Sequence, residues 1–125
     1  METLVTVHSW LRWLVLLALL GGAVVGVYRY RARAEFEPSL FQLAVMTVDI
    51  QVAIGIVIWI VDDGWSETFF FKVLHPAFML VALAVAHMGL VVAKRRNDER
   101  SYLLAGGSSL LALLLIVMGI PWDRL

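Results

Sequence analysis

Five ionisable side chains and one amide lie within or at the edge of long apolar stretches of this sequence. They include all three histidines of the chain, and the full set is His8, Arg12, Asp49, Gln51, His75 and His87. Ionisable groups inside an apolar span are costly, so each is a candidate for function. A neutral imidazole can ligate haem iron, and a histidine can exchange a proton near neutral pH. The chain has no cysteine, which excludes disulfides, thiolate metal sites, iron–sulfur clusters and covalent c-type haem attachment.

The stretches that carry these side chains are each long enough to cross a bilayer. A helix needs about 20 apolar residues to do so, and four segments qualify: residues 4–27, 40–61, 73–93 and 103–120. The mean hydropathy of +0.87 is too high for a soluble domain of 125 residues. Lipid offers no partner for unpaired backbone groups, so helices are expected. The sequence predicts an all-α, up-down bundle of four transmembrane helices, with residues 1–125 as a single integral membrane domain.

The connections between these segments differ in charge. Residues 28–39 and 94–101 together hold seven of the ten Lys+Arg, whereas residues 62–72 are mostly acidic. Basic loops stay in the cytoplasm, so both termini are expected on the outer side. No basic residue precedes the first apolar run, which argues against a cleaved signal peptide. Ten Lys+Arg balance ten Asp+Glu, so net charge indicates no nucleic-acid partner.

Depth in the membrane relates the histidines to one another. His8 and His75 both lie within a few residues of the outer ends of their spans, hence at nearly the same level for a rise of about 1.5 Å per residue. If their helices are neighbours, the two imidazoles can converge on one metal or cofactor. Arg12 lies one turn below His8, on the same face. His87 is roughly 18 Å further along the helix than His75 and about 120° around it, so these two cannot share one small metal ion. Met79, one turn below His75, is an alternative axial ligand for haem.

Each of these side chains also has a structural interpretation. Histidine is tolerated near the interface, where His8 lies, and His75 precedes a proline and can cap its helix. Asp49 can neutralise Arg12, or it can pair with His87 to handle a proton. A proton or ion pathway lined by Arg12, Asp49 and His87 is a further interpretation. Zinc or copper is less favoured, because a third strong ligand is missing at the outer level.

Several short motifs resemble one group of proteins. Residues 8–13 (HSWLRW) resemble the HS-x-LRW signature of small four-span bacterial membrane proteins labelled cytochrome b-like. Residues 71–79 (FKVLHPAFM) are similar to that group's aromatic–His–Met pattern, Gln51 and Gly55 resemble its Q-x-x-x-G step, and residues 119–122 look like its C-terminal ending. The resemblance covers nearly the whole chain. It implies haem b, with His8 and His75 at the matching positions, a weaker match at His87, and a place in the bacterial inner membrane.

Two functions are expected from these observations. The first is a membrane electron-transfer protein with one haem near the outer face, ligated by His8 and His75, that passes electrons between quinol and a partner. Arg12, Lys72 or Arg124 would then lie near the haem propionates. The second is a cofactor-free accessory subunit of a larger respiratory or photosynthetic membrane complex, with other membrane subunits or a second copy as partners. A quinone site near the polar groups of the first two helices is also considered, and no side chain is assigned a catalytic role.

Overall fold

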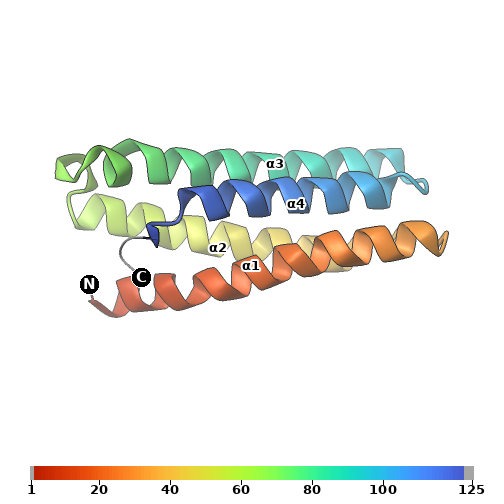
Figure 1. Cartoon of the computed structure of the whole chain (residues 1–125), viewed down its shortest axis with the longest axis horizontal. Helices are drawn as coiled ribbons and strands as arrows, with labels where there is room; N and C mark the ends of the chain where they lie inside the picture. The colour runs from red at the N-terminus through yellow and green to blue at the C-terminus, as the bar shows by residue number, and fades with distance from the viewer. Residues whose placement is uncertain (1, 123–125) are drawn as a thin grey trace.

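Each of the four apolar segments forms a helix in the structure, a computed structural model that describes residues 2–122 (Figure 1). The helices are α1 (Glu2–Arg31), α2 (Ser39–Val61), α3 (His75–Arg96) and α4 (Ser101–Gly119), and these residues contain no strand. Successive helices run in opposite directions, so the two ends of the chain meet at one end of the bundle. We call this the terminal end, and the opposite one, with the arginine-rich connections, the basic end. The predicted fold class is confirmed.

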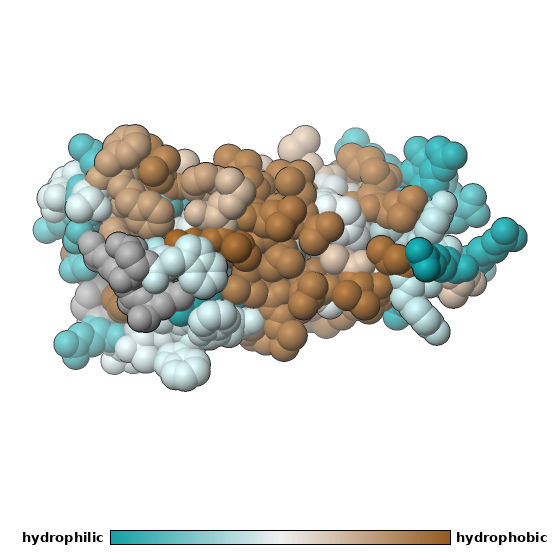
Figure 2. Space-filling view, in the orientation of Figure 1, coloured by the Kyte–Doolittle hydropathy of each residue, from teal (hydrophilic) through white to brown (hydrophobic). Residues whose placement is uncertain are grey.

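The surface of the bundle suits a bilayer. A wide apolar band crosses its middle and hydrophilic residues lie at both ends (Figure 2). Four helices within residues 2–122 are long and apolar enough to span a membrane, the third of them running from Phe70 to Arg96. Trp10 in the first turns of α1, Trp65 in the connection after α2 and Trp122 after α4 are exposed, and such positions suit an interfacial belt of aromatic residues. The protein is therefore a multi-pass membrane protein.

The order of the helices around the bundle follows from their contacts. α1 packs against α2 and α4, and α3 packs against the same two helices. α1 and α3 therefore lie diagonally opposite each other. α4 contributes many of the buried small residues: Ala105, Gly106, Ser109, Ala112 and Gly119. Small residues let membrane helices approach closely, and dispersion contacts and polar bonds then hold them together.

The closest approach of α1 and α4 is at a pair of glycines. A Cβ on Gly26 would lie 2.8 Å from the carbonyl oxygen of Tyr102 and 2.9 Å from the Cα of Gly106. Both are backbone atoms, which cannot rotate away. Gly22, one turn earlier on α1, faces the side chain of Ser109, whose Oγ would lie 3.0 Å from an added Cβ. The small-residue spacing in the sequence thus marks a helix contact within the bundle.

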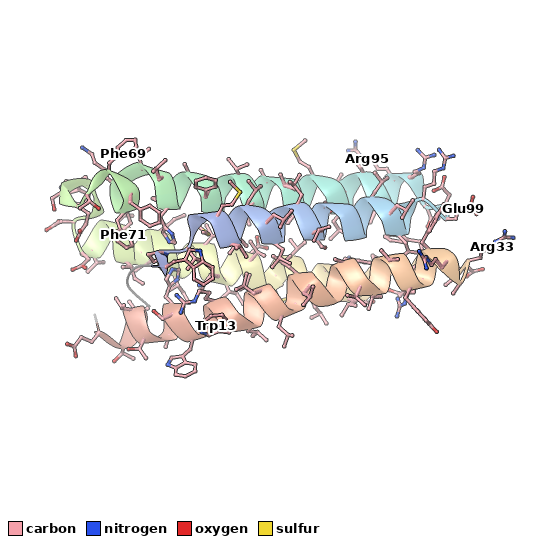
Figure 3. All side chains as sticks on the ribbon, viewed as in Figure 1. Trp13, Arg33, Phe69, Phe71, Arg95 and Glu99 are labelled. Atoms are coloured by element: carbon pink, nitrogen blue, oxygen red, sulfur yellow. The ribbon has the colours of Figure 1, made fainter. Side chains whose placement is uncertain are left out.

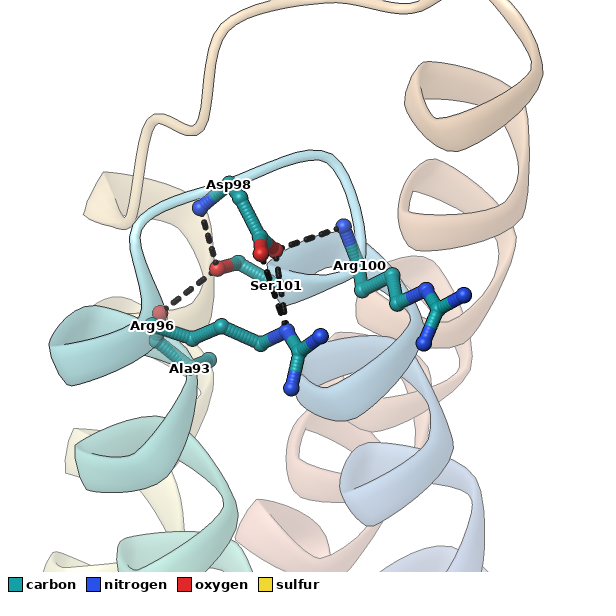
Figure 4. A network of polar contacts seen from close by, with 5 residues as sticks. All are labelled: Ala93, Arg96, Asp98, Arg100 and Ser101. Atoms are coloured by element: carbon teal, nitrogen blue, oxygen red, sulfur yellow. Dashed lines mark hydrogen bonds and ion pairs between the residues drawn. The ribbon is translucent and has the colours of Figure 1, made fainter.

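The turn between α3 and α4 at the basic end is held by a short polar network (Figure 4). α3 ends at Asn97 in the left-handed conformation, with φ of 46°, a position that asparagine tolerates. The Ser101 hydroxyl donates to the carbonyl of Ala93 at 2.7 Å and accepts from the backbone N–H of Asp98 at 3.0 Å. The Asp98 carboxylate accepts from the Arg96 side chain and from the backbone of Arg100. In Figure 3 the charged residues Arg33, Arg95 and Glu99 gather at this end.

Tyr102 holds the connection between α1 and α2 at the same end. Its buried hydroxyl donates to the carbonyl of Glu35 at 2.5 Å and accepts from the backbone N–H of Glu37 at 2.9 Å. The hydroxyl and backbone N–H of Ser39 hydrogen-bond the Glu37 carboxylate, and these bonds lower the pKa of Glu37. Both connections at the basic end are therefore ordered, and they fix the relative heights of the helices.

The glycine contact gives a test of the helix order. We expect Gly26→Ala to destabilise the protein by about 1–3 kcal/mol, because an added methyl group must separate two backbones. Thermal unfolding in detergent, followed by circular dichroism, would measure it. Gly21→Ala is the matched control, since nothing lies within 4 Å of a Cβ at that position. Equal melting temperatures for the two variants would contradict the α1–α4 contact.

Candidate cofactor site at the terminal end

A cavity of about 620 Å³ opens at the terminal end and is bounded by all four helices. Its volume lies within the range of pockets that bind small molecules and cofactors. Most of its walls are apolar, with side chains such as Val15, Val52, Ile56, Met79 and Ile116. The polar side chains that line it include His8, Arg12, Gln51, Trp59, Lys72 and His75. The cavity therefore combines an apolar slot with a few polar groups.

His75 is positioned by an irregular helical turn. The π-helical turn η2 (Phe70–Leu74) leads directly into α3, and the backbone N–H of His75 donates to the carbonyl of Phe70, five residues back. Pro76 has no N–H and its ring crowds the carbonyl four residues earlier, so a wider turn at this place relieves the clash. Such π-turns occur frequently at functional sites. The rings of Phe70 and Phe71 lie beside the imidazole, each with its centroid 5.9 Å away.

The imidazole of His75 is oriented by the end of α4. Its Nδ1 lies 2.7 Å from the carbonyl oxygen of Gly119. A Cβ on Gly119 would be 2.8 Å from both Phe78 Cβ and Met79 Cε, so glycine allows α4 to come this close to α3. The side chain does not cap α3, and that interpretation of His75 is wrong. Because a carbonyl oxygen only accepts hydrogen bonds, Nδ1 carries the proton and Nε2 keeps its lone pair.

His8 is held by two residues of α2. The Gln51 amide donates to the backbone carbonyl of His8 at 2.7 Å. One turn further along α2, Gly55 packs against the imidazole of His8. A Cβ at Gly55 would be 3.1 Å from His8 Cε1. The two residues of the Q-x-x-x-G spacing therefore act together, and both seat His8 against α2.

The two imidazoles face each other in the cavity. Their ring centroids are 6.4 Å apart and their planes are inclined by 82°. The expected convergence of His8 and His75 therefore occurs, although α1 and α3 are diagonal helices and not neighbours. The side chains meet across the bundle axis, which places any shared ligand in the interior and away from lipid.

Several buried polar atoms at the cavity have no hydrogen-bond partner within residues 2–122. They are His8 Nδ1, Arg12 Nε, Gln51 Oε1 and Trp59 Nε1. An unpaired buried polar group costs free energy, so a cluster of four is a reason to expect a ligand. The Arg12 guanidinium also lies over the ring of Trp13, with Cζ 4.8 Å from its centroid.

Trp59, which is not among the polar residues predicted from the sequence to form a site, also lines the cavity. The signal for this role is its spacing. Gln51, Gly55 and Trp59 recur every four residues on α2, and residues so spaced share one helix face. Trp59 also packs edge-to-face on Trp65, with centroids 5.5 Å apart.

Asp49 and His87 lie outside this cavity. The Nε2 atom of His87 is 2.6 Å from Asp49 Oδ1, and both side chains are about half exposed. Asp49 therefore pairs with His87, and the interpretation in which it neutralises Arg12 is wrong. His87 is not positioned to join His8 and His75 around one ligand. Of the residues Arg12, Asp49 and Gln51 considered for a quinone site, Arg12 and Gln51 line the cavity and Asp49 does not.

The other residues predicted for the haem site are Lys72, Met79 and Arg124. Lys72 and Met79 line the cavity, whereas Arg124 lies outside the described residues. In the part of the chain that the structure describes, no three His, Asp or Glu side chains come together as ligands for a metal ion. Two histidines leave the other coordination positions of a metal centre to further ligands, which a cofactor such as haem can supply.

Fold and cavity together define a four-helix integral membrane protein with an internal site of cofactor size. Comparisons with known proteins add no relative: no family model, no curated protein and no solved structure matches this chain.

The orientation of His75 can be tested directly. We expect His75 to be the Nδ1–H tautomer, because its partner is the carbonyl of Gly119. Nitrogen-15 NMR of the imidazoles in labelled protein distinguishes a protonated from an unprotonated Nδ1. Comparison with His75→Ala would assign the signal. An unprotonated Nδ1 at His75 would contradict the geometry of the site.

Proposed function

We propose that this protein is a membrane electron-transfer protein whose terminal-end cavity would hold one haem b, with His8 and His75 as the residues that would bind its iron. The observation that carries the proposal is the separation of 6.4 Å between the two ring centroids. Two imidazoles that share one metal ion, each through a bond of about 2 Å, would have centroids within roughly 6 Å of each other. The two rings already have the spacing that such a site requires.

The other residues of the cavity fit the same group. Imidazole nitrogen is a good axial ligand, and four-helix bundles are a common host for such cofactors. The bond from Nδ1 of His75 to the Gly119 carbonyl is the kind of outer contact that orients a ligating histidine. Arg12 and Lys72 line the cavity and supply cations for the two carboxylates of the group. The unpaired Arg12 Nε would then find an acceptor.

When bound, haem b supplies a one-electron redox couple at the level of the two imidazoles. The chain contributes orientation through Gly119 and Gln51, and exclusion of water through the apolar walls. By the charge of the loops, the terminal end faces outward from a bacterial inner membrane. In this proposal the protein passes electrons between membrane quinol and a partner protein at that face. The resemblance of residues 8–13 and 71–79 to cytochrome b-like proteins supports the same function.

Visible spectroscopy is the decisive measurement. Protein purified in detergent from haem-replete cells should give the reduced-minus-oxidised bands of haem b, and His8→Ala and His75→Ala should each abolish or strongly weaken them. His87→Ala is the matched control, because this third histidine is paired with Asp49 outside the cavity. Its spectrum should equal that of the wild type.

Two results would overturn the proposal. If wild-type protein from haem-replete cells shows no haem bands, the remaining hypothesis is the cofactor-free accessory subunit. Such a subunit should co-purify with a partner in stoichiometric amount in mild detergent. Unchanged bands in both His8→Ala and His75→Ala would refute the ligands. Circular dichroism and gel filtration on each variant would show that a lost spectrum does not reflect loss of folding.

The charge of Arg12 gives a second test of the cavity. Arg12→Gln should lower the midpoint potential, because reduction adds negative charge that a nearby cation stabilises. The change is on the order of 1 kcal/mol, or a few tens of millivolts for one electron. Spectroelectrochemical titration would measure it. Arg29→Gln, which removes a charge at the basic end beside Tyr102, should leave the potential unchanged, and equal shifts in the two variants would contradict a site near Arg12.

A further inference from the structure

The ion pair between Asp49 and His87 stands on the outer surface of the bundle, away from the cavity. Asp49 is near the middle of α2 and His87 lies beside it on α3, with Nε2 and Oδ1 2.6 Å apart. Their side chains are 44% and 49% exposed. The other carboxylate oxygen of Asp49 and the Nδ1 of His87 have no hydrogen bond within residues 2–122. The pair is thus only partly satisfied.

A bilayer makes this position unfavourable. The pair lies near the middle of two helices that are long and apolar enough to span a membrane, so its surroundings would be hydrocarbon and not water. Ionisable groups inside a span almost always face protein or a water-filled cavity. The cavity at the terminal end does not reach Asp49 or His87. We conclude that another protein surface covers this face of α2 and α3.

We propose that a second copy of this chain covers the face around Asp49 and His87 in a two-fold dimer. The face is self-complementary when His87 is the imidazolium partner of Asp49, because it then carries one free acceptor on Asp49 and one free N–H donor, Nδ1, on His87. Under two-fold symmetry the Asp49 of one copy meets the His87 of the other, and the reverse contact forms at once. Two copies inserted in the same direction have their pairs at the same depth by symmetry. A different subunit would need its own complementary polar groups at that depth, which symmetry would not provide.

The residues around the pair favour close approach. Ala53 lies one turn from Asp49 on α2, and Ala84 lies about one turn from His87 on α3; both are exposed. Small residues at a membrane interface allow backbones to come near, so that polar groups can bond across it. The opposite side of the bundle differs, because residues 13–27 of α1 and 103–119 of α4 carry no ionisable side chain. Its exposed side chains include Leu17, Leu20, Leu110 and Leu114. That side is suited to lipid.

The absence of native cysteine makes disulfide crosslinking between copies a clean test. Ala84→Cys, purified and reconstituted in phosphatidylcholine vesicles at high lipid excess, should form a disulfide dimer on mild oxidation. Leu20→Cys is the matched control: it is exposed on α1, at a similar distance from the basic end of its helix. We expect several-fold more dimer from Ala84→Cys than from Leu20→Cys. Similar yields from both faces, or no dimer from Ala84→Cys, would overturn the proposal.

A second variant ties the dimer to the ion pair. Adding Asp49→Leu to Ala84→Cys should lower the dimer yield to that of Leu20→Cys, because the cross-copy contact loses its acceptor. An unchanged yield would refute the role of the pair. Protein labelled at Leu20→Cys with one fluorophore provides a readout that does not depend on a disulfide. It should bleach in two steps in vesicles, and mostly single steps would overturn the dimer. Neither experiment requires haem, so the dimer and the proposed function can fail separately.

Discussion

The absence of water from the hydrocarbon core is the constraint on which this structure depends. Every polar group within the spans must find a partner in the protein, since lipid provides none. Helices satisfy the backbone, and close contacts such as that of Gly26 with Gly106 bring α1 and α4 together. At the basic end, the hydroxyls of Ser101 and Tyr102 donate to backbone carbonyls near the ends of the helices, so these polar groups also have partners in the protein.

The terminal-end cavity is where this requirement is not met within the described chain. Four buried polar atoms line it without partners, while Gln51, Gly55 and Gly119 hold the two histidines in place. A bundle that only filled space would not orient two imidazoles toward each other and leave their surroundings unsatisfied. Gly55 leaves room for the His8 ring to contact α2, and Gly119 leaves room for α4 to contact α3. The site is therefore built by small residues as much as by the histidines.

The two polar groups of the membrane region serve different purposes. His8 and His75 face inward across the bundle axis and line the cavity. Asp49 and His87 lie outside the cavity and are about half exposed on α2 and α3. Because the two groups lie on different faces, the internal site and the contact between copies do not compete for the same helix surfaces. A dimer would leave the cavity and its mouth accessible to an electron partner.

The lengths of the apolar segments, the charges of the loops and the depths of His8 and His75 in their spans can be read from the sequence. Each depends only on residue types and their spacing along the chain. That is why the four spans and the shared depth of these two histidines could be predicted. The order of the helices depends on how faces pack, and it decided that α1 and α3 are diagonal. Packing also paired Asp49 with His87 and left Arg12 in the cavity. Depth alone could not distinguish those pairings, because it does not specify the direction in which a side chain leaves its helix.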